Sequence, residues 1–257
     1  MMGARIVTFV NQKGGVGKTT TAVSVAAALG RQGQRVLLVD MDPQANATSA
    51  SGLDARAQEG VYGILLDEVP ASQCIVPVPD EPFSVIPSSP GLAGAEVELV
   101  PVMARERRLA TALAPLRPDF DWILVDCPPS LGLLTINALT ASDAVVIPVQ
   151  CEYMALEGLS RLMETLELVR KNLNPHLTVL GVILTMFDGR TRLAQQVVDE
   201  VRSHFSQAFE TVIPRAVRLS EAPSHGQTIF RYDPGGRAAN AYEALAVELL
   251  ARTAVPA

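Results

Sequence analysis

Short apolar runs rich in β-branched residues alternate along the chain with longer segments in which apolar residues recur every three or four positions. The short runs predict buried strands, and the longer segments predict amphipathic helices. The predicted strands cover residues 6–10, 35–40, 83–87, 122–126, 144–149, 178–185 and 211–213. The predicted helices cover residues 18–32, 96–116, 133–140, 156–172, 192–209 and 238–252.

This alternation predicts an α/β fold: one mostly parallel, twisted sheet of seven to eight strands with helices on both faces. The proline-rich stretch 76–90 contains a predicted strand of its own, and no repeat or low-complexity linker divides the chain. We therefore expect residues 1–257 to form a single domain. Chemically distinctive residues follow the first, second and fourth predicted strands, and the carboxyl ends of parallel strands are where such sheets bind ligands.

Composition narrows the classes of protein that fit. Hydrophobic residues make up 48% of the chain and charged residues 19%, which excludes a disordered chain. The net charge of −6 disfavours nucleic-acid binding through the whole surface but allows a local arginine patch. The scattered residues Cys74, Cys127 and Cys151 favour reduced, buried thiols over a metal site. No apolar run reaches the length of a membrane span, so we expect a cytoplasmic protein that does not bind membranes.

The segment between the first predicted strand and the first predicted helix has the composition of a phosphate-binding loop. It contains Lys13 and Lys18, two of only three lysines in a chain with eighteen arginines. Its glycines lack a Cβ, so backbone N–H groups can surround phosphate oxygens at the N-terminus of the next helix. The pattern G-x-x-x-x-G-K-[ST] is met except at its first position, which is Gln12. The expected nucleotide contacts are Gly14, Gly15, Val16, Gly17, Lys18, Thr19 and Thr20.

Carboxylates follow two other predicted strands. Asp40 and Asp42 stand at the exit of the second strand, and Asp126 ends the fourth, as in a Walker B segment. Each signal is weak alone, but together with the loop they predict a site for ATP and Mg²⁺. The expected metal ligands, direct or through water, are Thr19, Asp42 and Asp126.

Taken together, these motifs resemble the ParA/Soj family of partition ATPases, within the P-loop group that has a deviant Walker A motif. The resemblance covers residues 11–21, 40–49, 92–99, 126–132, 151–159, 184–190, 212–223 and the region of Tyr242. It implies an Mg²⁺-dependent ATPase that forms a homodimer with ATP sandwiched between subunits. The lack of room for a helix-turn-helix before the first predicted strand suggests the short, chromosomal type.

The resemblance also implies roles for individual residues. Lys13, Lys18 and Asp42 are the expected catalytic residues: Lys13 crosses to the other subunit's nucleotide, and Asp42 orients the attacking water. Asp126 supports the metal through a bound water, and Asp40 couples the loop after the second strand to the γ-phosphate. The expected adenine contacts are Met186, Phe187 and Pro214.

Nonspecific double-stranded DNA is the expected cargo, bound in the ATP state. The resemblance places DNA-binding basic residues near Arg190 and Arg218, with Arg215 and Arg192 beside them, whereas Arg202 and Arg237 fit a solvated helical face. A ParB-like centromere-binding protein is the expected partner that stimulates hydrolysis, and the protein is expected on the nucleoid.

Four alternatives remain open at this point. A membrane-placed MinD relative needs a basic amphipathic end, but residues 245–257 contain one arginine and no lysine. Iron-sulfur relatives need bridging cysteines, which Cys127 and Cys151 do not resemble. A ligase of the dethiobiotin synthetase type would turn over ATP only with a metabolite, and a binding module without catalysis would not need Lys18, Thr19 and the aspartates together. Whether the cargo is a chromosome or a plasmid also stays open.

Overall fold

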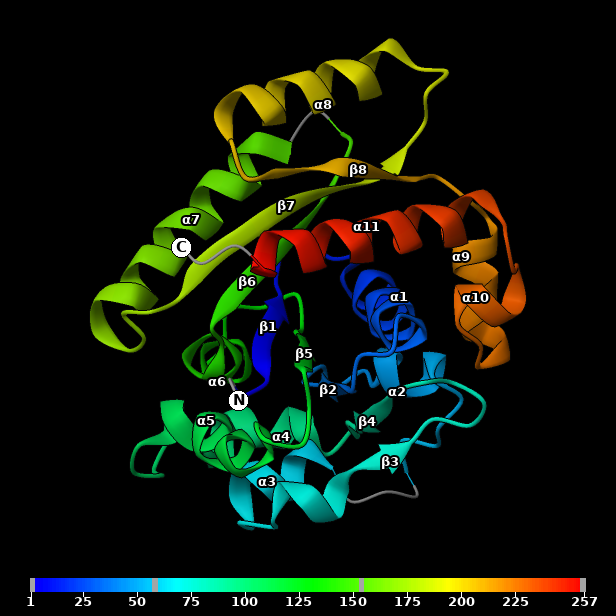
Figure 1. Cartoon of the computed structure of the whole chain (residues 1–257). Coiled ribbons are helices and arrows are strands. Elements are labelled where there is room, and N and C mark those ends of the chain that lie inside the picture. Colours follow the sequence, from blue (N-terminus) through cyan, green and yellow to red (C-terminus); the bar gives the residue numbers. More distant parts are fainter. Residues whose placement is uncertain (1–2, 57–59, 153–154, 255–257) are drawn as a thin grey trace.

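The computed structural model describes residues 3–56, 60–152 and 155–254. One eight-stranded sheet crosses the molecule in the order β3-β4-β2-β5-β1-β6-β7-β8 (Figure 1), and all neighbours are parallel except β3 and β4. The strands are β1 (Arg5–Phe9), β2 (Val36–Asp40), β3 (Val76–Pro77), β4 (Ser84–Ile86), β5 (Trp122–Asp126), β6 (Ala144–Gln150), β7 (Thr178–Phe187) and β8 (Ala208–Pro214).

Helices cover both faces of this sheet, as the sequence pattern predicts. The α-helices are α1 (Lys18–Arg31), α2 (Asn46–Ala50), α3 (Val61–Leu66), α4 (Leu92–Glu98), α5 (Arg108–Leu113), α6 (Leu133–Ala141), α7 (Ala155–Asn172), α8 (Arg192–His204), α9 (Arg218–Glu221), α10 (Ile229–Tyr232) and α11 (Arg237–Ala254). Short 3-10 turns are η1 (Ala71–Cys74), η2 (Arg105–Arg107), η3 (Ala114–Leu116) and η4 (Ala222–His225). No helix in the described part of the chain is long and apolar enough to cross a membrane.

Strand periodicity divides the core between the two faces. In β1, Val7 and Phe9 point into the cluster beneath α1 and α11, whereas Ile6 points into the cluster beneath α3 to α6. Successive side chains of a strand point to opposite faces, so the apolar runs serve both layers. A third cluster packs α7 and α8 against β6 and β7.

The expected helix 96–116 is wrong, because the structure breaks it into α4, η2, α5 and η3. Pro101 lies inside the predicted helix, where its ring removes an N–H donor and disfavours helical backbone at the preceding residue. Ala104 then adopts a left-handed conformation with φ of 53° before η2 starts. The chain is therefore interrupted where a continuous helix was expected.

The expected helix 192–209 runs too far. It ends at His204, and Phe209 is fully buried in β8.

The strands β1, β2 and β5 end side by side, since Phe9 and Asp40 are both register partners of Asp126. This shared end brings the phosphate-binding loop and the aspartates together.

Candidate nucleotide site and arginine surface

The loop between β1 and α1 is held rigidly against two neighbouring strands. The buried Asn11 side chain donates from Nδ2 to the Pro148 carbonyl of β6 at 2.7 Å. The Thr185 hydroxyl of β7 donates to the Val16 carbonyl at 2.8 Å. Gly15 and Gly17 have φ of 74° and 85°, in the left-handed region that favours glycine. The loop is therefore shaped before any ligand arrives.

The first turn of α1 is free to bind an anion. In the part of the chain that the structure describes, no side chain caps its N-terminus, and no acidic residue lies in its first turn. A Cβ added at Gly14 or Gly15 would meet no atom within 4 Å, so there is open space beside these backbone groups. Uncapped N–H groups at the positive end of a helix dipole are a ready site for phosphate.

The two lysines of the loop point to different surroundings. Lys18 is only 6% exposed, and its Nζ donates to the Lys13 carbonyl at 3.2 Å. Burial lowers the pKa of Lys18, while Asp126 and Asp42 act in the opposite direction. The Lys13 side chain is 51% exposed, and its Nζ lies 3.0 Å from Oε2 of Glu152. Lys18 thus belongs to the cradle, and Lys13 belongs to the surface beside it.

Asp40 is tied to α2. Its Oδ2 accepts from the Thr48 backbone N–H at 2.8 Å and from the Thr48 hydroxyl at 2.7 Å. The Thr48 hydroxyl oxygen also accepts from the Ser88 N–H at 3.0 Å. Burial raises the pKa of Asp40 to about 6, although the bonds from Thr48 lower it. Sequence reasoning linked Asp40 to nucleotide sensing but missed Thr48 and Ser88.

Asp126 is a buried carboxylate whose surroundings fit a bound cation. The residue is fully buried, and neither carboxylate oxygen has a hydrogen-bond partner among the described residues. Burial raises its pKa well above the ordinary value and the Asp40 carboxylate adds to the effect, whereas the nearby Thr19 hydroxyl and the Lys18 ammonium lower it. A buried carboxylate is stabilised by a nearby positive charge. The orphaned oxygens therefore fit a bound divalent cation.

The donor set around Asp126 fits Mg²⁺ better than a transition metal. Asp42 is 7% exposed, and its Oδ1 accepts from the Gln44 N–H at 3.0 Å. No group of three His, Cys, Asp or Glu side chains that could hold a metal occurs within the described ranges. Mg²⁺ keeps several waters and binds through one or two carboxylates plus substrate phosphates, so it needs no such group. Thr19, Asp42 and Asp126 are the residues that would hold it.

Two of the three expected adenine contacts line one cavity. A cavity of about 350 Å³ next to the loop is lined by Met186 and Pro214 together with Gly17, Thr20 and Tyr242. Phe187 is not in that lining and packs instead against the α7 and α8 cluster. The structure therefore places Met186 and Pro214 together beside the loop, whereas the Phe187 side chain packs in a different cluster although its backbone pairs with Pro214.

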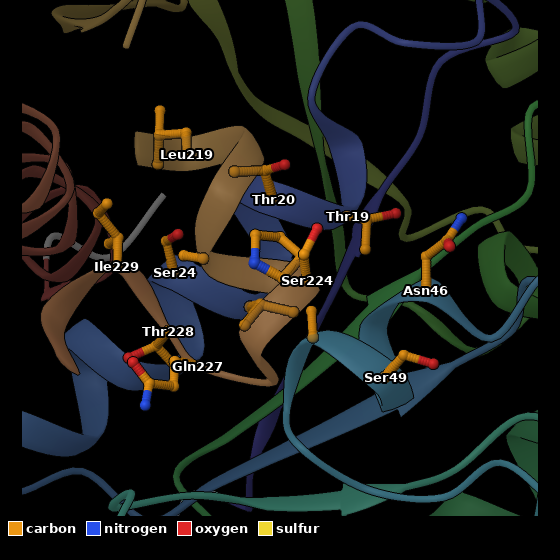
Figure 2. Close-up of a pocket in the computed structure, with 14 residues that line it drawn as sticks. Thr19, Thr20, Ser24, Asn46, Ser49, Leu219, Ser224, Gln227, Thr228 and Ile229 are labelled. Atoms are coloured by element: carbon orange, nitrogen blue, oxygen red, sulfur yellow. The ribbon is translucent and has the colours of Figure 1, made fainter. Parts of the chain in front are cut away.

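A second cavity, of about 400 Å³, has no counterpart in the sequence analysis. It lies between α1, α2 and residues 219–229 (Figure 2), and mostly hydroxyl and amide side chains line it. The labelled lining residues are Thr19, Thr20, Ser24, Asn46, Ser49, Leu219, Ser224, Gln227, Thr228 and Ile229. Its polar walls come from segments far apart in the chain, so no local pattern indicates it.

The four arginines expected to bind DNA lie after β7 and β8. Phe187 and Pro214 are register partners near the ends of these strands, so the segments that follow are neighbours. We call Arg190, Arg192, Arg215 and Arg218 the arginine surface; all four side chains are exposed.

Carboxylates already pair with two members of the arginine surface. Arg190 lies 2.7 Å from Asp188, and Arg218 lies 2.9 Å from Glu221. The Arg190 guanidinium lowers the pKa of Asp188, to which Arg215 also contributes. DNA phosphates would have to replace these partners.

Comparison of the chain with known proteins identifies its family. Residues 4–179 match the family model of an AAA domain. The sporulation initiation inhibitor protein Soj of Bacillus subtilis is 56% identical over 249 residues, covering 96% of this chain and 98% of Soj. The chromosome partitioning protein ParA of Myxococcus xanthus is 52% identical over 250 residues, covering 96% of this chain and 88% of ParA.

Solved structures agree on the fold. Cobyrinic acid a,c-diamide synthase from Mycobacterium smegmatis, with bound ADP and magnesium, superposes with a TM-score of 0.84 at 38% identity. The match covers 98% of this chain and 96% of the synthase. With relatives more than half identical over nearly the full length, a rigid phosphate-binding loop and an orphaned aspartate beside it, the chain belongs to the Soj/ParA family of chromosome-partitioning ATPases.

Proposed function

We propose that this protein binds and hydrolyses ATP with Mg²⁺, and that ATP drives the formation of a homodimer that binds double-stranded DNA without sequence preference. The observation that carries the proposal is the different placement of the two lysines in one loop. Lys18 is buried in its own cradle, whereas Lys13 is half-exposed and paired with Glu152. An exposed pair of this kind is weak, so Lys13 is free to change partner.

Within one subunit the loop and α1 bind the nucleotide. The first-turn N–H groups and Lys18 bind the phosphates, and Thr19 and Asp126 hold the cation, as the bound ADP and magnesium of the synthase neighbour would suggest for this chain. When bound, Mg²⁺ neutralises charge on the phosphates. Asp42 positions the attacking water, and the cavity beside Met186 and Pro214 holds the adenine.

The second subunit completes the site. Lys13 would leave Glu152 and contact phosphates bound by the partner copy, so that hydrolysis waits for dimerisation. A cation that arrives in trans can stabilise the charge that develops in phosphoryl transfer. A ParB-like centromere-binding protein would then accelerate hydrolysis and release the dimer from the nucleoid, consistent with relatives named for chromosome partitioning.

DNA binding rests on the arginine surface. Each phosphate neutralised contributes a slope of only about −0.9 in log K against log salt, so one subunit binds duplex weakly. A dimer presents two copies of the surface. We therefore expect Arg218→Glu to abolish duplex binding in the ATP state; undiminished binding by this variant, or equal binding by nucleotide-free wild type, would count against the proposal.

Size exclusion of the Asp42→Ala protein tests the whole sequence of events. With ATP and Mg²⁺ the variant should elute as a trapped dimer and should shift further when duplex DNA is added. Without nucleotide it should elute as a monomer. A monomer under all conditions, or phosphate release as fast as wild type, contradicts the proposal.

Lys13→Ala separates the roles of the two lysines. It should bind a fluorescent ATP analogue as wild type does, yet lose hydrolysis by about 100-fold or more, as expected when a transition-state donor is removed. Lys18→Ala should lose nucleotide binding itself. Turnover that requires an added metabolite, rather than DNA and a ParB-like partner, would instead indicate a ligase.

A further inference from the structure

We propose that α2 and a backbone contact between Gly52 and Gly226 transmit the state of the nucleotide site to the arginine surface. The inference deepens the proposed function and rests on it, because it names the route by which ATP would control DNA binding. The route begins at Asp40 and Asp42 and ends at Arg218.

The first link joins the end of β2 to α2. Asp40 lies in β2, and it receives both the backbone N–H and the hydroxyl of Thr48 in α2. It also accepts from the Asp42 N–H at 3.2 Å. A displacement of Asp42 toward a nucleotide therefore pulls on the same carboxylate that holds α2. Because α2 is little more than one helical turn, it moves as a unit.

The second link is a contact between two glycines with no room for a side chain. A Cβ on Gly52 would lie 2.8 Å from the Gly226 carbonyl oxygen, and a Cβ on Gly226 would lie 2.9 Å from the Gly52 Cα. Both residues have positive φ, 75° and 60°. Backbone therefore packs directly on backbone, and a movement of α2 reaches residue 226 without being absorbed by flexible side chains.

The third link is the continuous segment from Gly226 back to Arg218. η4 ends one residue before Gly226 and follows α9 directly, and α9 begins with Arg218. Glu221, the last residue of α9, accepts from Arg218 at 2.9 Å and from the Tyr232 hydroxyl at 3.1 Å through the same oxygen. A shift of η4 therefore changes where Arg218 is held.

The 400 Å³ cavity explains how these parts can move. Asn46 and Ser49 of α2 face it from one side, and Ser224 and Gln227 face it from the other (Figure 2). Packed cores resist displacement, whereas a cavity leaves space into which α2 or η4 can shift. The close contact between Gly52 and Gly226 then passes the shift of one segment to the other.

The test compares Gly226→Ala with Gly235→Ala. Gly235 also has a positive φ, 75°, but a Cβ there meets no atom within 4 Å, so this variant carries the backbone strain without the clash. The measured quantity is the ratio of the duplex Kd without ATP to the duplex Kd with ATP and Mg²⁺, from fluorescence anisotropy. We expect Gly235→Ala to keep the wild-type ratio. Gly226→Ala should bind a fluorescent ATP analogue normally, but its Kd ratio should be lower than the wild-type ratio by about tenfold or more.

Ser49→Leu is the second variant, for the case in which Gly226→Ala does not fold. Ser49 is exposed on the cavity wall, so a leucine there fills the space without disturbing the core. It too should lower the ratio. A folded Gly226→Ala protein that keeps the wild-type ratio overturns the inference, and so does an unchanged ratio in Ser49→Leu.

Hydrogen exchange distinguishes failure of the inference from failure of the proposed function. In wild type, ATP with Mg²⁺ should change exchange in residues 44–52 and also in residues 222–227, which do not line the cavity beside Met186 and Pro214. A change confined to residues 44–52 overturns the inference. A wild-type Kd ratio near one overturns ATP-controlled DNA binding itself, while the exchange pattern still decides whether the two segments are coupled.

Discussion

Thr48→Val should destabilise the nucleotide-free protein strongly, although the two side chains have nearly the same shape. Thr48 is fully buried, donates to Asp40 at 2.7 Å and accepts from the Ser88 N–H at 3.0 Å. Losing a hydrogen bond to a charged group costs about 1.5–3 kcal/mol, and leaving the buried Ser88 N–H unsatisfied costs about 1–3 kcal/mol. We therefore expect a loss of about 3–5 kcal/mol, a large share of a typical stability of about 5–15 kcal/mol.

The loss should depend on pH in a defined direction. Thr48 favours the ionised form of Asp40, whose pKa is raised by burial to about 6. Removing the hydroxyl raises that pKa further, so the variant binds a proton more readily than wild type. The destabilisation should therefore be larger at pH 7.5 than at pH 5, by about 1 kcal/mol, the difference between a charged and a neutral hydrogen bond.

Urea unfolding followed by circular dichroism at both pH values measures this effect. Thr48→Ser is the matched control, because it keeps the hydroxyl and removes only a methyl group, at about 1 kcal/mol. A Thr48→Val protein within 1 kcal/mol of the serine variant at pH 7.5 would refute the energetic importance of the Asp40–Thr48–Ser88 bonds. A penalty that is the same at both pH values would refute the link to Asp40 ionisation.

Two further predictions concern the surface and the core. Glu221→Gln should strengthen duplex binding in the ATP state by about two- to fivefold per subunit, since Arg218 no longer has to leave a carboxylate. The control in the same anisotropy assay is Glu210→Gln, which changes an exposed ion pair outside the arginine surface. The thiols of Cys127 and Cys151 should react with Ellman's reagent at pH 8 only after unfolding in urea. The reason is that burial raises the pKa of Cys127 well above its usual value and the pKa of Cys151 to about 11. Fast reaction of either thiol in the native protein would contradict this prediction.

Much of the sheet could be predicted because its strands are short apolar runs with sharp polar ends. The expected strand 122–126 coincides with β5, and the expected strand 35–40 differs from β2 by one residue. The segments that were missed, α2, α3, α9 and α10, are too short to show a helical period. They form because tertiary contacts hold them, as Thr48 holds α2 to Asp40, and such contacts leave no mark in a window of sequence.

The candidate site also contains residues that a sequence motif reveals and residues that only the fold brings together. The glycines, Lys18 and Thr19 are adjacent in sequence, so their chemistry is visible as a local motif. The contact between Gly52 and Gly226 joins distant parts of the chain, and Gly226 lies outside the segments that resembled a known family, between residues 212–223 and the region of Tyr242. Neither glycine belongs to a recognisable phosphate-binding pattern. Only the folded chain shows that both positions exclude a side chain.

The presence of lysine rather than arginine at positions 13 and 18 follows from the different surroundings of the two side chains. An arginine at position 18 would place a planar guanidinium in the loop, where the Lys18 ammonium now donates to the Lys13 carbonyl. A guanidinium also stays charged when it is buried, whereas burial lowers the pKa of Lys18. Lys13 has the opposite requirement in the proposed dimer, because it would have to exchange Glu152 for another anion. A single-point ion pair between half-exposed groups is easily broken, whereas a bidentate arginine pair would hold Glu152 more firmly. Lys13→Arg should therefore bind nucleotide normally but form the ATP-dependent dimer more slowly, and a dimerisation rate equal to wild type would show that release of Glu152 does not limit assembly.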